Sequence, residues 1–251
     1  MLIVSDVHGA HEALRRVAAR GGPLLVLGDL INFIDYRNND GIIADVAGRD
    51  FVEEIVRLRT AGRHAAAGEL WRELRENHTR DLRGEFETHA ESAYVEVCAA
   101  LEGVEAYVTY GNVDRPDMLR RMLPPTARFV DGDVVEIEGR TVGFVGGGMA
   151  SIRAAGEVSE EGIAAKLDAL GPVEVLCTHM PPQIEWLARD VIGGYKHSAA
   201  VRDYIERHQP AYHFFGDVHQ PRALTWRVGA TRCHNVGYFR ATGRPFRFEQ
   251  G

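Results

Sequence analysis

The sequence predicts an α/β fold that carries an inserted helical subdomain. Short apolar runs that end in polar residues recur along the 251-residue chain, and segments with apolar residues at helical spacing lie between several of them. Residues 40–102 break this rhythm, because they are rich in Ala, Glu and Arg and contain no Pro. Apolar runs of this length are typical of buried strands, and their alternation with helices is typical of α/β proteins.

The chain begins with a predicted strand–helix–strand unit. Residues 2–5 and 24–27 are apolar runs of strand length, and residues 12–20 between them have apolar side chains at helical spacing. Gly21-Gly22-Pro23 then ends the helix, because glycine is common just past a helix and proline cannot continue one. The later elements are strands at 106–110, 173–178 and 212–215, helices at 160–170 and 198–208, a hairpin of 134–137 with 142–145, and a hairpin of 223–228 with 232–238.

Residues 40–102 are predicted to form a helical cap within a single domain of residues 1–251. Its helices are expected at 50–60, 64–76 and 83–101. The segment leaves the sheet just after a strand end that carries candidate chemistry, which favours a lid over that end. A packed decoration covering a sheet edge and an arm for homodimer formation are the alternatives.

The composition excludes several kinds of partner and location. Asp and Glu number 36 against 29 Lys and Arg, so the formal net charge is −7, and general attraction to nucleic acid or to a membrane surface is not expected. Three widely spaced cysteines with no CxxC pair indicate reduced thiols in the cytoplasm. The first residues do not resemble a secretory signal, and no apolar run is long enough to cross a bilayer.

Five predicted strands end in residues that can bind metal. These ends are Asp6-Val7-His8, Gly28-Asp29, Gly111-Asn112-Val113-Asp114, Thr178-His179 and Gly216-Asp217-Val218-His219. Each alone has an ordinary explanation, because Asp and Asn after Gly are common in turns and a single His is often only hydrogen-bonded. Together they lie where open α/β sheets place their ligands. A mixed set of His, carboxylate and amide suits Mn, Fe, Zn or Co better than a thiolate-bound zinc.

The order of these motifs resembles the calcineurin-like metallophosphoesterase superfamily, whose pattern is D-x-H, G-D, G-N-H-D/E, H and G-H-x-H. The resemblance runs from Asp6 to His219 and implies a two-layer β-sandwich flanked by helices, an αββα arrangement, with two divalent metal ions at its edge. It implies that Asp29 bridges both metals, which suits a carboxylate because its two oxygens can hold cations roughly 3.5 to 4 Å apart. The implied ligands are Asp6, His8 and His219 for the first metal and Asn112 and His179 for the second.

The chain departs from this pattern at two positions. Val113 stands where a His commonly protonates the leaving group, which leaves the general acid unassigned. Asp217 replaces the first His of G-H-x-H. It could bind the second metal through oxygen and favour Mn over Fe, Zn, Co or Ni, or it could turn away and leave that site weak. The candidates for the general acid are His11, His78, His89 and His197.

The expected activity is hydrolysis of a phosphate ester by a hydroxide that bridges two divalent metal ions. A phosphodiesterase for a small-molecule or nucleotide substrate is favoured, because the missing His matters less when the leaving group needs little protonation. The alternatives are a phosphomonoesterase or protein phosphatase, and a non-catalytic interaction module of the same fold. The expected catalytic residues are Asp29, Asn112, Asp114 and His179.

Three further features near the predicted site each have two interpretations. Asp114 would orient a ligand or a water, unless it is only a solvated turn residue. Arg115, Arg120 and Arg121 could bind phosphate locally, or they could face solvent on a short helix. Gly146-Gly147-Gly148 could approach a phosphate through its backbone or form a tight turn, and we leave it outside the predicted site.

Overall fold

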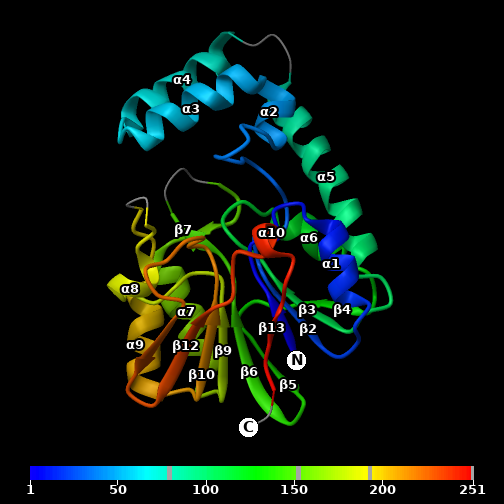
Figure 1. Ribbon diagram of the computed structural model, residues 1–251, viewed down its shortest axis with the longest axis vertical. Coiled ribbons are helices and arrows are strands. Elements are labelled where there is room, and N and C mark those ends of the chain that lie inside the picture. The colour runs from blue at the N-terminus through cyan, green and yellow to red at the C-terminus, as the bar shows by residue number, and fades with distance from the viewer. Residues whose placement is uncertain (78–80, 151–153, 192–193, 250–251) are drawn as a thin grey trace.

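The computed structural model describes residues 1–77, 81–150, 154–191 and 194–249, which form a sandwich of two sheets covered by helices on both outer faces (Figure 1). The strand order is β13-β1-β2-β3-β4 in the first sheet and β11-β12-β10-β9-β6-β5 in the second. This architecture confirms the predicted two-layer sandwich flanked by helices.

The first sheet contains β1 (Leu2–Val4), β2 (Leu24–Leu27), β3 (Ala106–Thr109), β4 (Ala127–Phe129) and β13 (Phe246–Arg247). The second contains β5 (Asp133–Ile137), β6 (Arg140–Val145), β9 (Val175–Thr178), β10 (Tyr212–Phe215), β11 (Thr225–Val228) and β12 (Thr231–Asn235). Strands β1 to β4 are parallel to one another, as are β6, β9, β10 and β12. The short strands β7 (Gly148–Met149) and β8 (Glu157–Val158) pair separately.

The central strands β1 and β2 are apolar throughout because both faces of the sheet are covered there. Successive side chains of a strand point to opposite faces, so Ile3 and Leu25 pack with Phe144 between the two sheets. Their neighbours Val4 and Val26 pack outward against the helices. All of these side chains are fully buried, which explains why β1 and β2 lack the alternation of polar and apolar residues seen in half-exposed sheets.

Helices complete the two outer layers. The first sheet is covered by α1 (His11–Ala18), part of α5 (Leu82–Ala100) and α6 (Pro116–Met122), and the second by α7 (Glu160–Leu170) and α9 (Ala199–His208). Helices α7 and α9 begin at Ser159 and Ser198, whose hydroxyls accept from the N–H groups of Gly162 and Val201. Short helices α8 (Glu185–Ala188) and α10 (Phe239–Thr242) lie in the loops.

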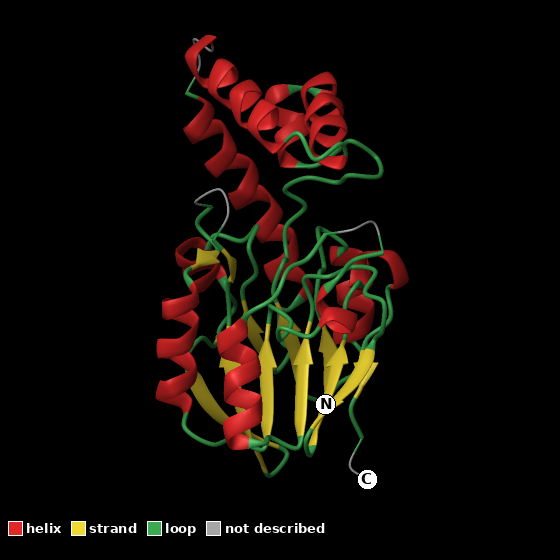
Figure 2. Cartoon of the chain, turned by 90° about the vertical axis from the view of Figure 1, so that its left-hand side faces the viewer, coloured by secondary structure: helices red, strands yellow, loops and turns green. Residues whose placement is uncertain are grey.

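The inserted segment forms a helical cap that stands over the sandwich (Figure 2). It consists of α2 (Ile42–Ala47), α3 (Arg49–Thr60), α4 (His64–Asn77) and the first part of α5. Ile55, Leu58 and Ala67 form its own small core. The later part of α5 packs into the main core through Tyr94 and Val97, so one continuous helix links the cap to the first sheet. Among the described residues, no helix combines the length and apolarity that a membrane span requires.

Candidate metal centre

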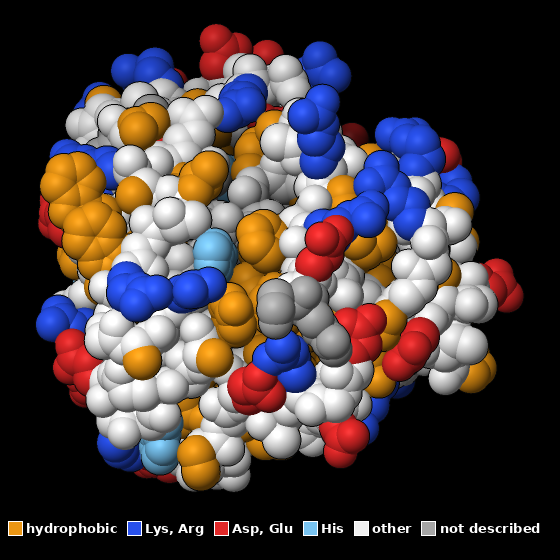
Figure 3. All heavy atoms as spheres, turned by 60° about the horizontal axis from the view of Figure 1, so that its bottom comes forward, with side chains coloured by type: hydrophobic (Ala, Val, Ile, Leu, Met, Phe, Trp, Pro, Cys, Tyr) orange, Lys and Arg blue, Asp and Glu red, His pale blue; other side chains and the backbone are white. Residues whose placement is uncertain are grey.

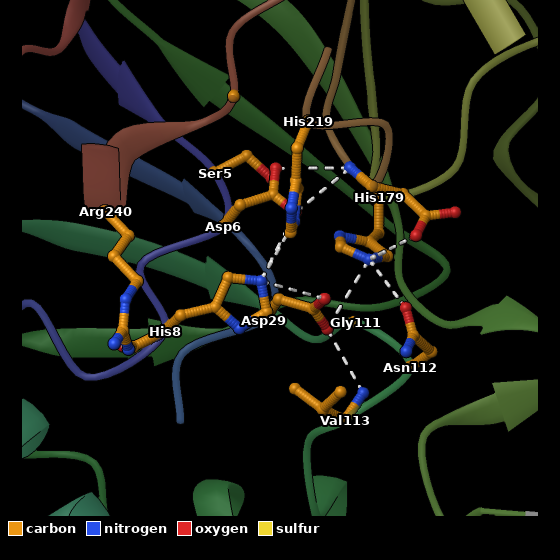
Figure 4. A network of polar contacts seen from close by, with 12 residues as sticks. Ser5, Asp6, His8, Asp29, Gly111, Asn112, Val113, His179, His219 and Arg240 are labelled. Carbon is orange, nitrogen blue, oxygen red and sulfur yellow. Dashed lines mark hydrogen bonds and ion pairs between the residues drawn. The ribbon is translucent and has the colours of Figure 1, made fainter. Parts of the chain in front are cut away.

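The predicted ligands converge at the edge of the sandwich where the parallel strands of both sheets end (Figure 4). Asp6 and His8 follow β1, Asp29 follows β2 and Asn112 follows β3, all in the first sheet. His179 follows β9, and Asp217 and His219 follow β10, in the second sheet. The site therefore lies where the two sheets meet.

The backbone turns sharply at four of these residues. Asp6, His8, Asp29 and Asp217 have φ values of 59°, 42°, 52° and 65°, in the left-handed region that non-glycine residues seldom adopt. Such conformations cost roughly 1–3 kcal/mol each and are concentrated at functional sites. Here they turn each side chain off its strand and toward the shared edge.

Two glycines allow the neighbouring loops to touch. Gly28, which precedes Asp29, has φ +94°, and a Cβ there would lie 2.4 Å from the backbone nitrogen of Gly111. A Cβ on Gly111 would lie 2.1 Å from Asp29 Oδ1 and 2.6 Å from His179 Nε2. Any side chain at Gly111 would therefore displace two of the predicted ligands.

The first group of ligands consists of Asp6, His8 and His219, whose ligand atoms lie within 4.8 Å of one another. His8 Nε2 is 3.1 Å from His219 Nε2, and His219 Nε2 is 3.4 Å from Asp6 Oδ1. His8 Nδ1 lies 3.3 Å from the carbonyl oxygen of Ile31. We assign the proton to this Nδ1, which leaves the Nε2 lone pair directed into the group.

The second group is built around His179, whose Nδ1 donates to the carbonyl oxygen of Leu27 at 2.8 Å. Its Nε2 lies 3.5 Å from Asp29 Oδ1 and 3.4 Å from Asn112 Oδ1. The other oxygen of Asp29, Oδ2, lies 3.6 Å from His8 Nε2. Asp29 thus reaches both groups with one oxygen each, as the resemblance implied for a bridging ligand.

The donor set fits a pair of cations. In the second group an imidazole lone pair, a carboxylate oxygen and an amide oxygen face one another, and such acceptors repel unless a positive charge lies between them. Asp6, Asp29 and His179, which supply one ligand atom each within 4.8 Å of one another, are almost completely buried. When carboxylates are buried this close together, their negative charge must be neutralised by a cation or a proton.

The pKa shifts show how strongly the groups interact. Burial favours the neutral form of His179, but the charges of Asp29, Asp217 and Asp6 outweigh it and raise the pKa of the imidazole. Burial lowers the pKa of His8, which the attraction of Asp29 only partly offsets. Burial would raise the pKa of Asp6, yet the surrounding imidazoles, His219 above all, lower it well below its ordinary value.

Asp217 has a second partner that the sequence did not reveal. Its Oδ1 lies 3.9 Å from His179 Nε2, at the margin of the second group, and 2.5 Å from Lys196 Nζ. The surrounding protein partly desolvates this half-exposed lysine and so opposes its charge, but Asp217, Asp29 and Asp6 raise its pKa above the ordinary value. Asp217 was expected either to bind the second metal or to turn away from the site. The structure shows that its carboxylate faces the site and forms an ion pair with the ammonium group of Lys196.

Val113 and Asp114 support the site without facing it. Val113 packs against the core beneath the helices, and its N–H donates to Asp29 Oδ1 at 3.1 Å. Asp114 is fully buried, so it is not a solvated turn residue. Its carboxylate accepts from the N–H groups of Leu30 at 3.0 Å and Gly111 at 2.9 Å, and burial together with the nearby Asp29 raises its pKa to about 6.

The histidines considered as general acids lie elsewhere. His11 faces Glu96 on α5 at 3.9 Å, His89 faces Asp45 at 4.0 Å, and the His197 ring packs 4.3 Å from that of Tyr195. His78 lies outside the described residues. A cavity opens beside the predicted ligands, and none of the three described histidines lines it.

The other phosphate-binding candidates are also engaged away from the site. Arg115 packs over Phe33 with 5.3 Å between guanidinium carbon and ring centroid, and Arg120 packs over Phe129 at 4.4 Å; Arg121 is exposed on α6. The amides of Gly146, Gly147 and Gly148 donate to Asp131 Oδ1, the Tyr110 carbonyl and the Gly156 carbonyl. The amides of that glycine run are therefore occupied by other parts of the protein, and Gly148 begins the short strand β7.

A cavity of about 420 Å³ opens beside the ligands. The loop after β2, the end of α3 in the cap and the segments around Lys196 and Tyr238 line it. Tyr238 stacks on His219, with ring centroids 4.0 Å apart. Arg240 donates to the His8 carbonyl at 2.5 Å and pairs with Asp35 at 2.7 Å. Sequence reasoning missed these residues, because they belong to no motif and reach the site only through the fold.

One comparison with known proteins identifies a family. The family model for calcineurin-like phosphoesterases matches residues 1–221, which include every predicted ligand. No curated protein matches the chain significantly.

Proposed function

Because the chain belongs to the calcineurin-like phosphoesterase family, we propose that it is a phosphodiesterase for a small-molecule or nucleotide substrate that works with two divalent metal ions. Membership supports a metal-dependent phosphoester hydrolase in general. The observation that carries the use of two metal ions is the position of Asp29. Its Oδ1 lies 3.5 Å from His179 Nε2, while its Oδ2 lies 3.6 Å from His8 Nε2.

The metals would be held by the two groups described above. When bound, divalent ions acidify water and offset negative charge on the phosphoryl oxygens. The protein's own task is to fix the ligands: the backbone carbonyls of Ile31 and Leu27 orient the imidazoles of His8 and His179. Asp114, one of the expected catalytic residues, ties the loops after β2 and β3 together by accepting from their backbone N–H groups.

Two observations favour a diester of small size. Val113 offers no proton to a leaving group, and no described His that we considered as a replacement reaches the cavity. The cavity of about 420 Å³ falls within the range of small-molecule pockets. Figure 3 turns the end of the sandwich opposite the cap toward the viewer, and on this face, remote from the site, acidic and basic side chains are interspersed without a continuous basic stripe among the residues coloured there.

The remaining parts of the proposal follow from the chemistry of the ligands and the position of the cap. Carboxylate and amide oxygens from Asp6, Asp29 and Asn112 favour manganese among the candidate cations. The cap contributes Thr60 to the cavity wall, which favours a lid over an arm for dimerisation. Free Cys98, Cys177 and Cys233 suit a cytoplasmic enzyme.

The test combines metal analysis with two aryl esters. Purified protein loaded with manganese should contain two ions per chain and should hydrolyse bis(p-nitrophenyl) phosphate faster than p-nitrophenyl phosphate. Faster turnover of the monoester would replace the proposed reaction by a phosphomonoesterase. Two bound metals without hydrolysis of either ester would instead support a non-catalytic module of this fold.

A further inference from the structure

An ammonium group lies beside the second group of ligands. Lys196 Nζ is 2.5 Å from Asp217 Oδ1 and 3.4 Å from the carbonyl oxygen of the same residue. The same Asp217 Oδ1 lies 3.9 Å from Nε2 of His179, around which the second group is built. The ammonium group is therefore one ion pair away from the residues that would hold the second metal.

This ion pair balances the charge that Asp217 brings to the site. A neutral imidazole occupies this position in the motif of the family, whereas Asp217 adds a negative charge to a cluster that already contains Asp6 and Asp29. Lys196 cancels that charge. The pair of Asp217 and Lys196 thus has the same net charge as the imidazole it replaces, but it also presents a cation.

The cation faces the cavity and is not sealed inside the protein. The Lys196 side chain is 51 % exposed, whereas that of Asp217 is 2 % exposed, and both residues line the cavity. An ammonium group has three N–H donors, and the contacts with Asp217 use two of them. The lysine backbone is fixed, because its N–H donates to the Ala188 carbonyl at 3.0 Å.

We propose that Lys196 binds a phosphoryl oxygen of the substrate and that Asp217 is the positioning residue that holds the ammonium group beside the second group of ligands. This inference rests on the proposed function, since it assigns the cation a role toward the same phosphate. A compact ammonium is a common phosphate ligand in proteins. This role also explains why Asp217 is compatible with the site, since its carboxylate holds the Lys196 ammonium there as a substrate-binding group in addition to the metals.

The chain offers a matched control. Only two of its 29 Lys and Arg residues are lysines, and the other, Lys166, also pairs with a carboxylate, 2.8 Å from Asp131 Oδ2. Lys166 does not line the cavity beside the metal ligands. Lys196→Met and Lys166→Met therefore remove the same charge and break the same kind of ion pair, inside and outside the proposed site.

The first measurement is the binding of inorganic phosphate to manganese-loaded protein by calorimetry, which does not depend on turnover. Lys196→Met should weaken this binding about tenfold to a hundredfold, because a hydrogen bond from a charged donor is lost. Lys196→Arg should recover part of the affinity, and Lys166→Met should bind as wild type does. Metal content, measured on the same samples, should stay at two ions in all of them.

A second measurement separates positioning by Asp217 from metal ligation. Asp217→Asn should weaken phosphate binding in the wild-type background and have little further effect when combined with Lys196→Met, because the two residues act as a unit. Loss of one metal ion in Asp217→Asn, in both backgrounds, would overturn the positioning role and make Asp217 a ligand.

Failure of this inference is distinguishable from failure of the proposed function. Unchanged phosphate affinity in Lys196→Met, with wild-type hydrolysis of the diester intact, would reduce the ion pair to a structural contact. Phosphate binding that depends on Lys196 in a protein that hydrolyses neither ester would preserve the inference and reject the proposed phosphodiesterase.

Discussion

His179 Nε2 lies 3.5 Å from Asp29 Oδ1, although the two residues follow strands of different sheets. The contact exists only when the two sheets are packed together. The apolar layer that joins the sheets, which includes Ile3 and Phe214, therefore also brings the candidate metal ligands together. Folding of the sandwich and formation of the site are coupled through this edge.

Asp29→Asn should remove most of the metal and lower kcat for the diester by at least about a hundredfold, since loss of a bridging ligand exceeds the usual effect of a supporting residue. The fold should persist, because the change removes one of several buried negative charges. Metal analysis, circular dichroism and steady-state kinetics check this. Asp168→Asn, which alters an exposed ion pair with Arg207, is the control, and wild-type turnover in Asp29→Asn would contradict a bridging role.

Metal removal should lower the thermal stability of the protein. Ions that bind only the folded state add about 2.7 kcal/mol at a free concentration a hundred times the Kd, and at this edge they would join the two sheets. Differential scanning calorimetry with and without a chelator should show a lower Tm in the chelated sample. Asp29→Asn should lose this difference, and an identical Tm in both samples of wild type would show that no ion links the sheets.

Gly111→Ala should weaken metal binding and destabilise the fold, because its Cβ would lie 2.1 Å from Asp29 Oδ1. We expect a loss of about 1–3 kcal/mol, as is typical of overpacking. Gly68→Ala is the matched control, since Gly68 lies in α4 and a Cβ there meets nothing within 4 Å. That change should be neutral or stabilising by up to about 1 kcal/mol. Urea denaturation and metal analysis of both variants test the contrast.

The strands that position the site could be predicted from the sequence because their signal is local. The run 24–27 is apolar from end to end and the run 212–215 is apolar or aromatic apart from His213, and the structure places β2 and β10 over the same residues. The edge strands β4 and β13 were missed. With three and two residues they carry too little pattern, and they form only because β3 and β1 offer a free edge.

The convergence of the candidate site residues was predictable where a residue directly follows a strand. Lys196 was not, because nothing in the sequence around it indicates that it meets Asp217. His11 illustrates the opposite error. It is one of the four candidates for the general acid, but the turn into α1 directs it toward Glu96 on α5. Similarly, the sequence marks residues 83–101 as one cap helix, whereas Tyr94 and Val97 of α5 belong to the main core.

Acid should destabilise the protein partly through His213, which is fully buried on β10. The hydroxyl of Thr178 donates to the Met180 carbonyl at 2.6 Å, so His213 Nε2 must donate to Thr178 Oγ1, 2.9 Å away. Nδ1 is then left without a hydrogen-bond partner among the described residues. Burial accordingly lowers the pKa of His213 from 6.5 to about 3.

The sign of the effect follows from proton binding. Above pH 6.5 the imidazole is neutral in both the folded and the unfolded chain, and it adds no pH dependence. Between pH 6.5 and about 3 only the unfolded chain binds the proton, so the free energy of unfolding should fall by about 1.4 kcal/mol per pH unit from this residue. His213→Phe, which keeps an aromatic ring beside Phe215, should lose this contribution. Urea denaturation of metal-free wild type and variant between pH 7 and pH 5 measures the difference, and parallel curves would show that His213 takes up its proton in the folded state as readily as in the unfolded chain.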